Sequence, residues 1–133
     1  MRQPFASSLV LGVRPIEIRS RAWTAPEERI LIHAAAADHA IGVDYMRDPR
    51  RWPACPPVRS LPHRAILGSV LVRGSLPLTD LTGDAWAELP AGIDPTKLHA
   101  WVLADPRALA TPISWADGAL GLWTYPGTIA IAA

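Results

Sequence analysis

Charged residues that could do chemistry gather in a short stretch where Glu17 lies between Arg14 and Arg19. Isoleucines alternate with Glu17 and Arg19, as on a strand, because successive side chains of a strand point to opposite faces. Glu17 and Arg19 therefore share one face, and Arg14 and Arg21 extend it into a polar strip. Guanidinium and carboxylate groups on one face can bind a planar ligand through paired hydrogen bonds. On a solvated strand the same residues would form a surface ion pair worth about 0–1 kcal/mol.

A nucleotide site needs cations for phosphate, planar donors and acceptors for base edges, and an aromatic face for stacking. The arginines of the polar strip supply the cations. Glu17 and Gln3, the only glutamine, could contact the Watson–Crick edge of a base. Stacking of a base on Trp23 would contribute roughly 1–3 kcal/mol, and packing at the rim of the fold is the alternative role for this ring. The candidate ligand-binding residues are thus Gln3, Arg14, Glu17, Arg19, Arg21 and Trp23.

Metal-assisted cleavage of RNA is the enzymatic alternative. Magnesium needs one or two carboxylates together with substrate phosphate, and Glu17 with Asp105 or Asp38 could supply them. Glu17 is the best candidate for a catalytic residue. The four histidines show no zinc-like spacing, so we predict no metal site of the protein's own. We also predict no cofactor, apart from a divalent cation if the protein is a nuclease.

Length and composition limit the possible classes of protein. The 133 residues suit one domain, residues 1–133, with a substantial apolar core. No apolar run approaches the roughly 20 residues needed to cross a bilayer, and the first residues lack the pattern of a signal peptide. The single cysteine agrees with a reducing cytoplasm. A net charge of +1 argues against binding of nucleic acid by bulk electrostatics.

Short strands dominate the expected secondary structure. We predict strands over residues 16–20, 29–34, 65–73 and 98–105, the last ending at Pro106, from their apolar and alternating patterns. Residues 109–114 are expected to be extended, 118–125 to form a loose strand or turn, and 128–131 to form a final strand. Gly68 inside the third strand indicates a bulge or a close approach of backbone. Four to six strands with one or two helices favour a compact β-barrel with helical decoration.

The helices and loops are marked by glycine and proline. A short helix is predicted over residues 3–12, with Pro4 in its first turn, Gly12 at its end, and Phe5 and Leu9 in the core. A second helix is predicted over residues 35–47, and Trp101 and Trp123 are also expected in the core.

The segment from Arg50 to His63 is too rich in proline for regular structure, and it carries a basic–aromatic cluster of Arg50, Arg51 and Trp52. A protein-interaction module acting through this segment is the third functional alternative, beside the binding module and the nuclease.

Four stretches, taken in order, resemble one known family. They are Gln-Pro-Phe-Ala-Ser at residues 3–7, Gly-Val-Arg-Pro-Ile-Glu-Ile-Arg at 12–19, Ile-Leu-Ile-His-Ala at 30–34 with Ala-Ile-Leu-Gly at 65–68, and Ala-Trp-Val-Leu at 100–103 with Gly-Leu-Trp at 121–123. The chain resembles the ASCH domain family, a branch of the PUA-like superfamily. The resemblance implies an α+β, mainly β fold, a PUA-like β-barrel with a short N-terminal helix and one or two peripheral helices. It also implies that the polar strip lines a cleft at the barrel mouth that binds RNA, a nucleotide or a modified base.

Two departures from the family pattern bear on activity. The family's signature lysine is Arg14 here, and Phe5 stands where Trp or Tyr is common. A small subgroup that resembles this family hydrolyses acylated cytidine with a Lys, a Thr and a Glu. Arginine, with a pKa above about 12, cannot be deprotonated in proteins, and Glu17 occupies the place that aligns with the threonine. Amidohydrolase chemistry is therefore the least favoured alternative, after ribonuclease.

Overall fold

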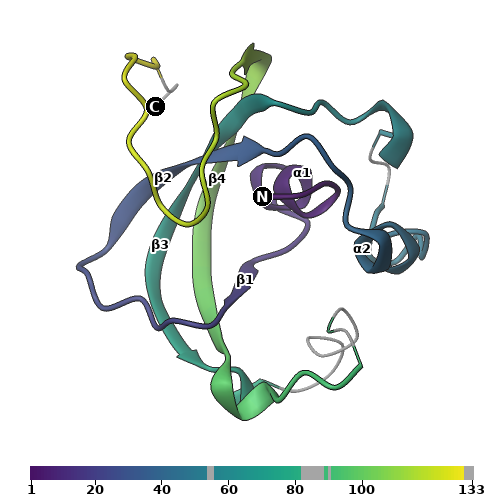
Figure 1. Ribbon diagram of the computed structural model, residues 1–133, viewed down its shortest axis with the longest axis vertical. Coiled ribbons are helices and arrows are strands. Elements are labelled where there is room, and N and C mark those ends of the chain that lie inside the picture. The colour runs from purple at the N-terminus through teal and green to yellow at the C-terminus, as the bar shows by residue number, and fades with distance from the viewer. Residues whose placement is uncertain (54–55, 82–88, 90, 131–133) are drawn as a thin grey trace.

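Four antiparallel strands form the framework of the molecule. The computed structural model describes residues 1–53, 56–81, 89 and 91–130. The strands lie in the order β1-β4-β3-β2 (Figure 1), with the bounds β1 Ile16–Arg19, β2 Glu28–Ala34, β3 Ala65–Pro77 and β4 His99–Ser114. The predicted α+β, mainly β class is confirmed. Within the described residues the sheet is open, with β1 and β2 at its edges, and it does not close into a barrel.

β3 and β4 are long because bulges let them bend without ending. Leu71 pairs with Ala104 and Ser69 with Arg107, so a single β3 residue lies opposite two β4 residues. One of these two is Asp105, with a φ of 44°, and the other is a proline, which a bulge tolerates because it needs no ladder hydrogen bond there. The prediction that this strand ends before that proline is therefore wrong, and the expected extended stretch at 109–114 belongs to the same strand.

Gly68 confirms the predicted close approach of backbone between β3 and β4. A Cβ atom at this position would lie 2.2 Å from the carbonyl oxygen of Arg107. No side chain fits at that distance, so glycine is what allows the two strands to meet here.

Helix α1 (Phe5–Val10) packs on the sheet, and all six of its residues are buried. Gly12 follows with a φ of 72°, as the predicted helix end requires. Leu9 belongs to the main core with Val70 and Trp101. Phe5 faces the other way and belongs to a second core cluster. The core positions predicted for both helix residues, and for Trp101, are confirmed.

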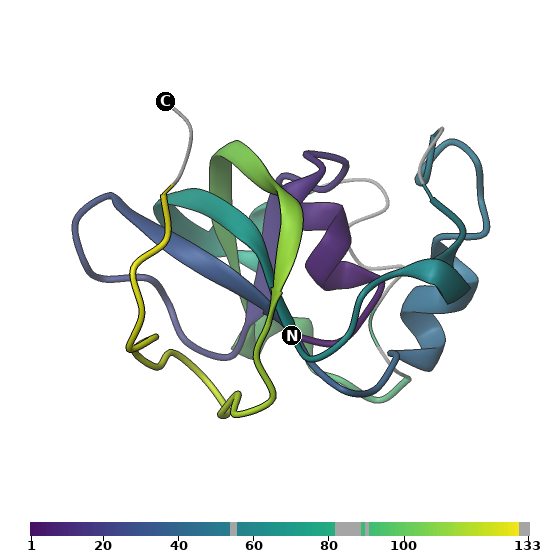
Figure 2. The same ribbon diagram turned by 90° about the horizontal axis from the view of Figure 1, so that it is seen from above.

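The second cluster anchors a lobe of residues 40–61. It comprises α2 (Ala40–Tyr45), which is shorter than predicted, an irregular chain, and one 3₁₀ turn at Val58–Ser60. Trp52 is only 8% exposed and clusters with Phe5, Met46 and Leu61, and its Nε1 donates to the carbonyl of Pro56 over 2.8 Å. Viewed from above, the lobe lies on one side of α1 and the C-terminal end on the other (Figure 2).

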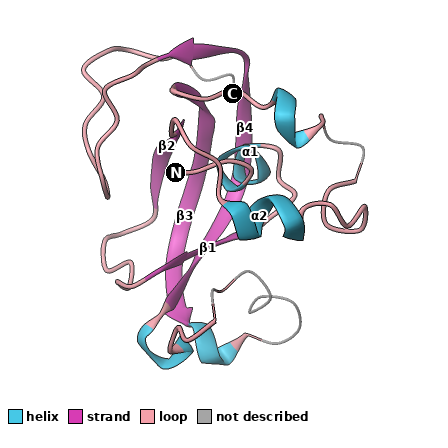
Figure 3. Ribbon diagram, turned by 45° about the vertical axis from the view of Figure 1, so that its right-hand side comes forward, coloured by secondary structure: helices cyan, strands magenta, loops and turns pink. Residues whose placement is uncertain are grey.

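The remaining elements are short. Two 3₁₀ turns, Leu78–Asp80 and Pro95–Lys97, contact each other where β3 ends and β4 begins (Figure 3). The stretch at 118–125 is loop. Residues 128–130 were predicted to form a strand, but they do not. Residue 131 of that predicted strand, together with Cys55 and Trp86, lies outside the described residues. In the described part of the chain, no helix is both long and apolar enough to cross a membrane.

Candidate functional site

The polar strip folds into a compact charge cluster at the start of β1. Arg14 Nη1 lies 3.0 Å from Glu17 Oε2, and Arg19 Nε lies 3.1 Å from Glu17 Oε1. The side chains of Arg14 and Glu17 are 9% and 13% exposed, whereas that of Arg19 is 37% exposed. Each carboxylate oxygen of Glu17 thus faces one guanidinium group, and the cluster keeps one net positive charge. Arg19 is the member that reaches solvent.

Two aromatic rings from elsewhere in the chain support this cluster. The guanidinium carbon of Arg14 lies 4.7 Å from the ring centre of Phe5, and that of Arg19 lies 5.7 Å from Trp101. Cation–π contacts of this kind contribute about 0.5–2 kcal/mol. β1 pairs with β4 so that Glu17 lies opposite Trp101, which brings the ring under the strip. The rings also exclude water, which strengthens the ion pairs.

Arg19 holds its position through charge rather than a directed hydrogen bond. Its Nε is close to Glu17 Oε1, but its N–H points away from that oxygen and has no hydrogen-bond partner among the described residues. A buried donor without a partner costs free energy. Because Nε itself is shielded from solvent, an acceptor in the cleft would meet the exposed part of the Arg19 side chain instead.

A cleft of about 780 Å³ opens beside the charge cluster. Glu17, Arg19, Trp23 and Trp101 line it together with residues of β2 and of the C-terminal end. Trp23 packs edge-on against Trp101, with ring centres 5.0 Å apart. Its backbone N–H donates to Ser75 Oγ over 2.8 Å, and its indole N–H donates to the carbonyl of Pro26. The half-buried Trp23 is therefore both packed at the rim and part of the cleft wall.

Basic side chains outnumber acidic ones around the cleft. The charged side chains that line it are Arg2, Glu17, Arg19, Glu28, Arg29 and Arg64. Burial lowers the pKa of the Met1 amine from 8.0; the charge of Arg19 adds to this effect and that of Glu17 opposes it. The excess of arginine over glutamate side chains around the cleft favours an anionic ligand.

A second arginine of the cleft, Arg29, is held by the β4 bulge. Its Nη1 donates to Ser69 Oγ and to the carbonyl oxygen of Asp105, both over 3.0 Å. Its Nη2 forms a short contact with the carboxylate of Asp105. A hydrogen bond from Arg107, together with the charges of both arginines, lowers the pKa of Asp105. This cluster also keeps one net positive charge, so the cleft has two arginines in fixed positions.

The structure does not bring all predicted ligand residues to the cleft. Gln3 is completely buried: its Nε2 donates to the carbonyl of Pro62 over 2.6 Å, and its Oε1 accepts from the backbone N–H of Ser7. Arg14 lies behind Glu17 and does not line the cleft. Arg21 is exposed outside it, and its carbonyl oxygen accepts from Trp101 Nε1 over 2.7 Å. Glu17, Arg19 and Trp23 are the three predicted residues that line the cleft.

Sequence reasoning missed the residues that form the opposite side of the cleft. Arg29 and His33 were placed in a buried strand with no role in binding, and Trp123 was expected in the core. Trp123 instead lines the cleft, half-buried, and so does Tyr125. His33 Nε2 lies 2.7 Å from the carbonyl oxygen of Trp115. The aromatic spacing in residues 115–125 was the available signal for this wall.

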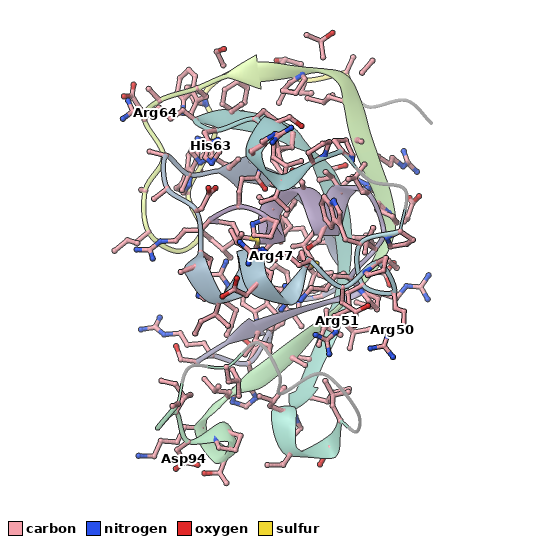
Figure 4. The ribbon with its side chains drawn as sticks, turned by 90° about the vertical axis from the view of Figure 1, so that its right-hand side faces the viewer. Arg47, Arg50, Arg51, His63, Arg64 and Asp94 are labelled. Atoms are coloured by element: carbon pink, nitrogen blue, oxygen red, sulfur yellow. The ribbon has the colours of Figure 1, made fainter. Side chains whose placement is uncertain are left out.

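The lobe does not cover the cleft. Of the described residues in the range 40–61, none lines the cleft. Figure 4 shows Arg47, Arg50 and Arg51 over the lobe, apart from Arg64. The basic–aromatic cluster is thus divided, because Trp52 turns into the core while Arg50 remains at the surface. The segment is an appendage packed on α1 and forms no lid.

The carboxylates considered for magnesium have separate partners. Asp38 lies 2.7 Å from His63 Nε2, and Asp105 pairs with its two arginines. Across the described part of the chain, no group of three His, Cys, Asp or Glu side chains could hold a metal ion. Nothing in this geometry favours the nuclease over the binding module.

Neither a family model nor a curated protein sequence matches this chain. The function is therefore argued from the geometry of the cleft.

Proposed function

We propose that this protein binds RNA or a nucleotide-like ligand in the cleft beside β1. The observation that carries the proposal is Arg19, a half-exposed guanidinium held by the partly buried carboxylate of Glu17 at the edge of a cleft walled by Trp23. Cation, planar donor and aromatic ring are the three components that recognition of a nucleotide requires.

Each residue has a distinct role in this proposal. Arg19 donates to a phosphate or to a base carbonyl, because its fork-shaped guanidinium suits both. Glu17 orients Arg19, since both of its oxygens already face arginines. An exocyclic amine on a base would have to compete with those ion pairs for Glu17. Trp23 offers an aromatic edge or face to the base.

The proposal includes membership of the ASCH family and its PUA-like fold. Support comes from the order of the elements: a helix at residues 5–10, then a strand carrying Glu17 and Arg19, which line a cleft as the resemblance implies. Closure into a barrel would need contacts between the two edges of the sheet beyond those of the described strands. The single cysteine supports a cytoplasmic setting for this function.

Binding should depend on shape and hydrogen bonds more than on total charge. The net charge is only +1, so few counterions would be released on binding and the salt dependence should be shallow. Tight, sequence-blind binding to DNA with a steep salt dependence would contradict the proposal.

The test is binding of a short labelled single-stranded RNA and of AMP by the purified protein. We expect Arg19→Ala to weaken binding at least about tenfold, because a charge-assisted hydrogen bond is lost. Arg47→Ala is the matched control: Arg47 also pairs with a nearby carboxylate, but it is 75% exposed and lies on the lobe. Equal losses in the two variants would contradict a role for the cleft.

The same reactions also test the alternatives when product formation is followed with and without magnesium. Metal-dependent cleavage that is lost in Glu17→Gln would assign ribonuclease activity. Release of the acyl group from an acylated cytidine would assign amidohydrolase activity. Absence of binding and turnover would refute the proposal and direct attention to a protein partner at residues 50–63.

A further inference from the structure

The wall of the cleft opposite the sheet is built by residues 116–125, here called the C-terminal segment. In Figure 1 the C-terminal segment is a U-shaped yellow loop in front of β2 and β3. Figure 2, which views the molecule from above, also shows the segment on this face of the sheet. Ala116 and residues 118–125 line the cleft together with Arg19 and Trp23. The cleft is therefore enclosed between the sheet and one irregular segment.

The C-terminal segment is joined to the rest of the molecule at few points. Just before it, the N–H of Trp115 donates to the carbonyl of Arg64, and the carbonyl of Trp115 contacts His33 Nε2, both over 2.7 Å. Beyond this anchor, its contacts include two aromatic pairs. The ring of Trp123 packs edge-on against His33, with centres 5.4 Å apart, and Tyr125 packs against Trp115 at 5.0 Å.

The leucine side chains of the C-terminal segment are more exposed than that of Trp123. Leu120 is fully exposed and Leu122 is 62% exposed, so these two contribute little to packing. Gly118 fits against the His33 ring, where an added Cβ would lie 2.4 Å from a ring carbon. His33 thus fixes the segment at two places, and Trp123 is the large ring that this arrangement holds over the cleft.

We propose that Trp123 is the stacking wall of the cleft, and that the C-terminal segment closes a planar base against the sheet while Arg19 holds its phosphate. This inference rests on the proposed function and narrows it to one class of ligand, a single nucleotide with one planar base. The volume of about 780 Å³ agrees with pockets for small ligands, which typically measure 300–1,000 Å³.

The test compares AMP with ribose 5-phosphate, which has the phosphate and no base, in wild type, Trp123→Ala and Trp123→Phe. We expect wild type to bind AMP on the order of tenfold or more tighter than ribose 5-phosphate, the gain of one stacked base. Trp123→Ala should bind AMP about as weakly as ribose 5-phosphate, whose own affinity should not change. Trp123→Phe should restore most of the preference, because an aromatic face returns.

Ile93→Ser is the control, since it alters an exposed apolar side chain that does not line the cleft, and it should leave both affinities unchanged. Equal AMP affinity in wild type and Trp123→Ala would overturn the inference while leaving the proposed function in place. If wild type bound neither AMP nor RNA, the inference and the proposed function would both fall. A loss of ribose 5-phosphate binding in Trp123→Ala would also overturn the stacking role, because that ligand has no base to stack.

Discussion

Two groups of arginines and acids in this protein have a similar spacing but opposite surroundings. At the start of β1, Glu17 pairs with Arg14 and Arg19, and the Glu17 side chain is 13% exposed. On the lobe, Asp44 pairs with Arg47 at the same spacing of three residues, and both side chains are more than 70% exposed. Glu17 and Arg19 of the first group line a cleft, whereas the second group is a surface ion pair.

The difference comes from aromatic residues that are distant in sequence. Phe5 lies against Arg14, and Trp101 lies against Arg19. Because these rings shield the guanidinium groups from water, the ion pairs with Glu17 matter more for stability than exposed pairs do. The lobe buries its tryptophan, Trp52, in its own core, while Arg47 and Arg50 remain at the surface. Spacing of charges alone therefore does not define a site; an aromatic floor beneath them does.

The largest expected effect tests whether the lobe and the cleft are independent of each other. Trp52→Ala should lower the free energy of unfolding by about 4 kcal/mol, the usual cost of removing a buried tryptophan. Because the lobe does not line the cleft, affinity for AMP should stay unchanged at a temperature where the variant is folded. Denaturant unfolding and calorimetric titration measure the two quantities. Loss of affinity in the folded variant would show that the regions are coupled.

The two ion pairs should differ strongly in their contribution to stability. Glu17→Ala leaves the nearly buried Arg14 without this carboxylate and should cost about 3 kcal/mol. Asp44→Ala should change the free energy of unfolding by less than about 1 kcal/mol, since exposed pairs contribute little. Urea unfolding of both variants checks the difference. Similar losses in the free energy of unfolding for the two variants would refute the claim that burial makes the Glu17 ion pairs the stronger ones.

The smallest effect concerns acid titration of the lobe. Hydrogen bonds from Arg50 lower the pKa of Asp48 from 3.8 to about 2. A carboxyl with a lowered pKa in the folded state stabilises the fold above its ordinary value, and this contribution is lost as the pH falls through about 2. Carboxyl chemical shifts followed against pH should give this midpoint, and Arg50→Ala should raise it toward 3.8. No change in that variant would contradict the assigned cause.

Patterns in the local sequence were enough to predict three of the elements. Alternation identified β1, an apolar run identified β2, and Pro4 and Gly12 marked the ends of α1. The continuation of β4 past Asp105 was missed, because a proline that usually ends a strand is tolerated where its own strand forms a bulge. That compensation depends on tertiary pairing and leaves no mark in the local sequence.

The candidate site could be predicted only in part, because tertiary structure brings some of its residues together. Glu17 and Arg19 share a strand face, so spacing alone placed them together. Gln3 was expected at the ligand because a lone polar side chain near a strip suggests contact, yet its amide joins two backbone segments. Trp123 was expected in the core because its neighbours are apolar, and only the tertiary structure shows that it lines the cleft.

The most direct test of the account follows the indole N–H resonances of the tryptophans by NMR during titration with AMP. Trp23 and Trp123 line the cleft, and Trp52 lies in the lobe as an internal reference. The account predicts that Trp23 and Trp123 shift together and saturate with one affinity, while Trp52 stays in place. Shifts confined to Trp52, or no shift at saturating AMP concentration, would contradict the claim that this cleft binds a nucleotide.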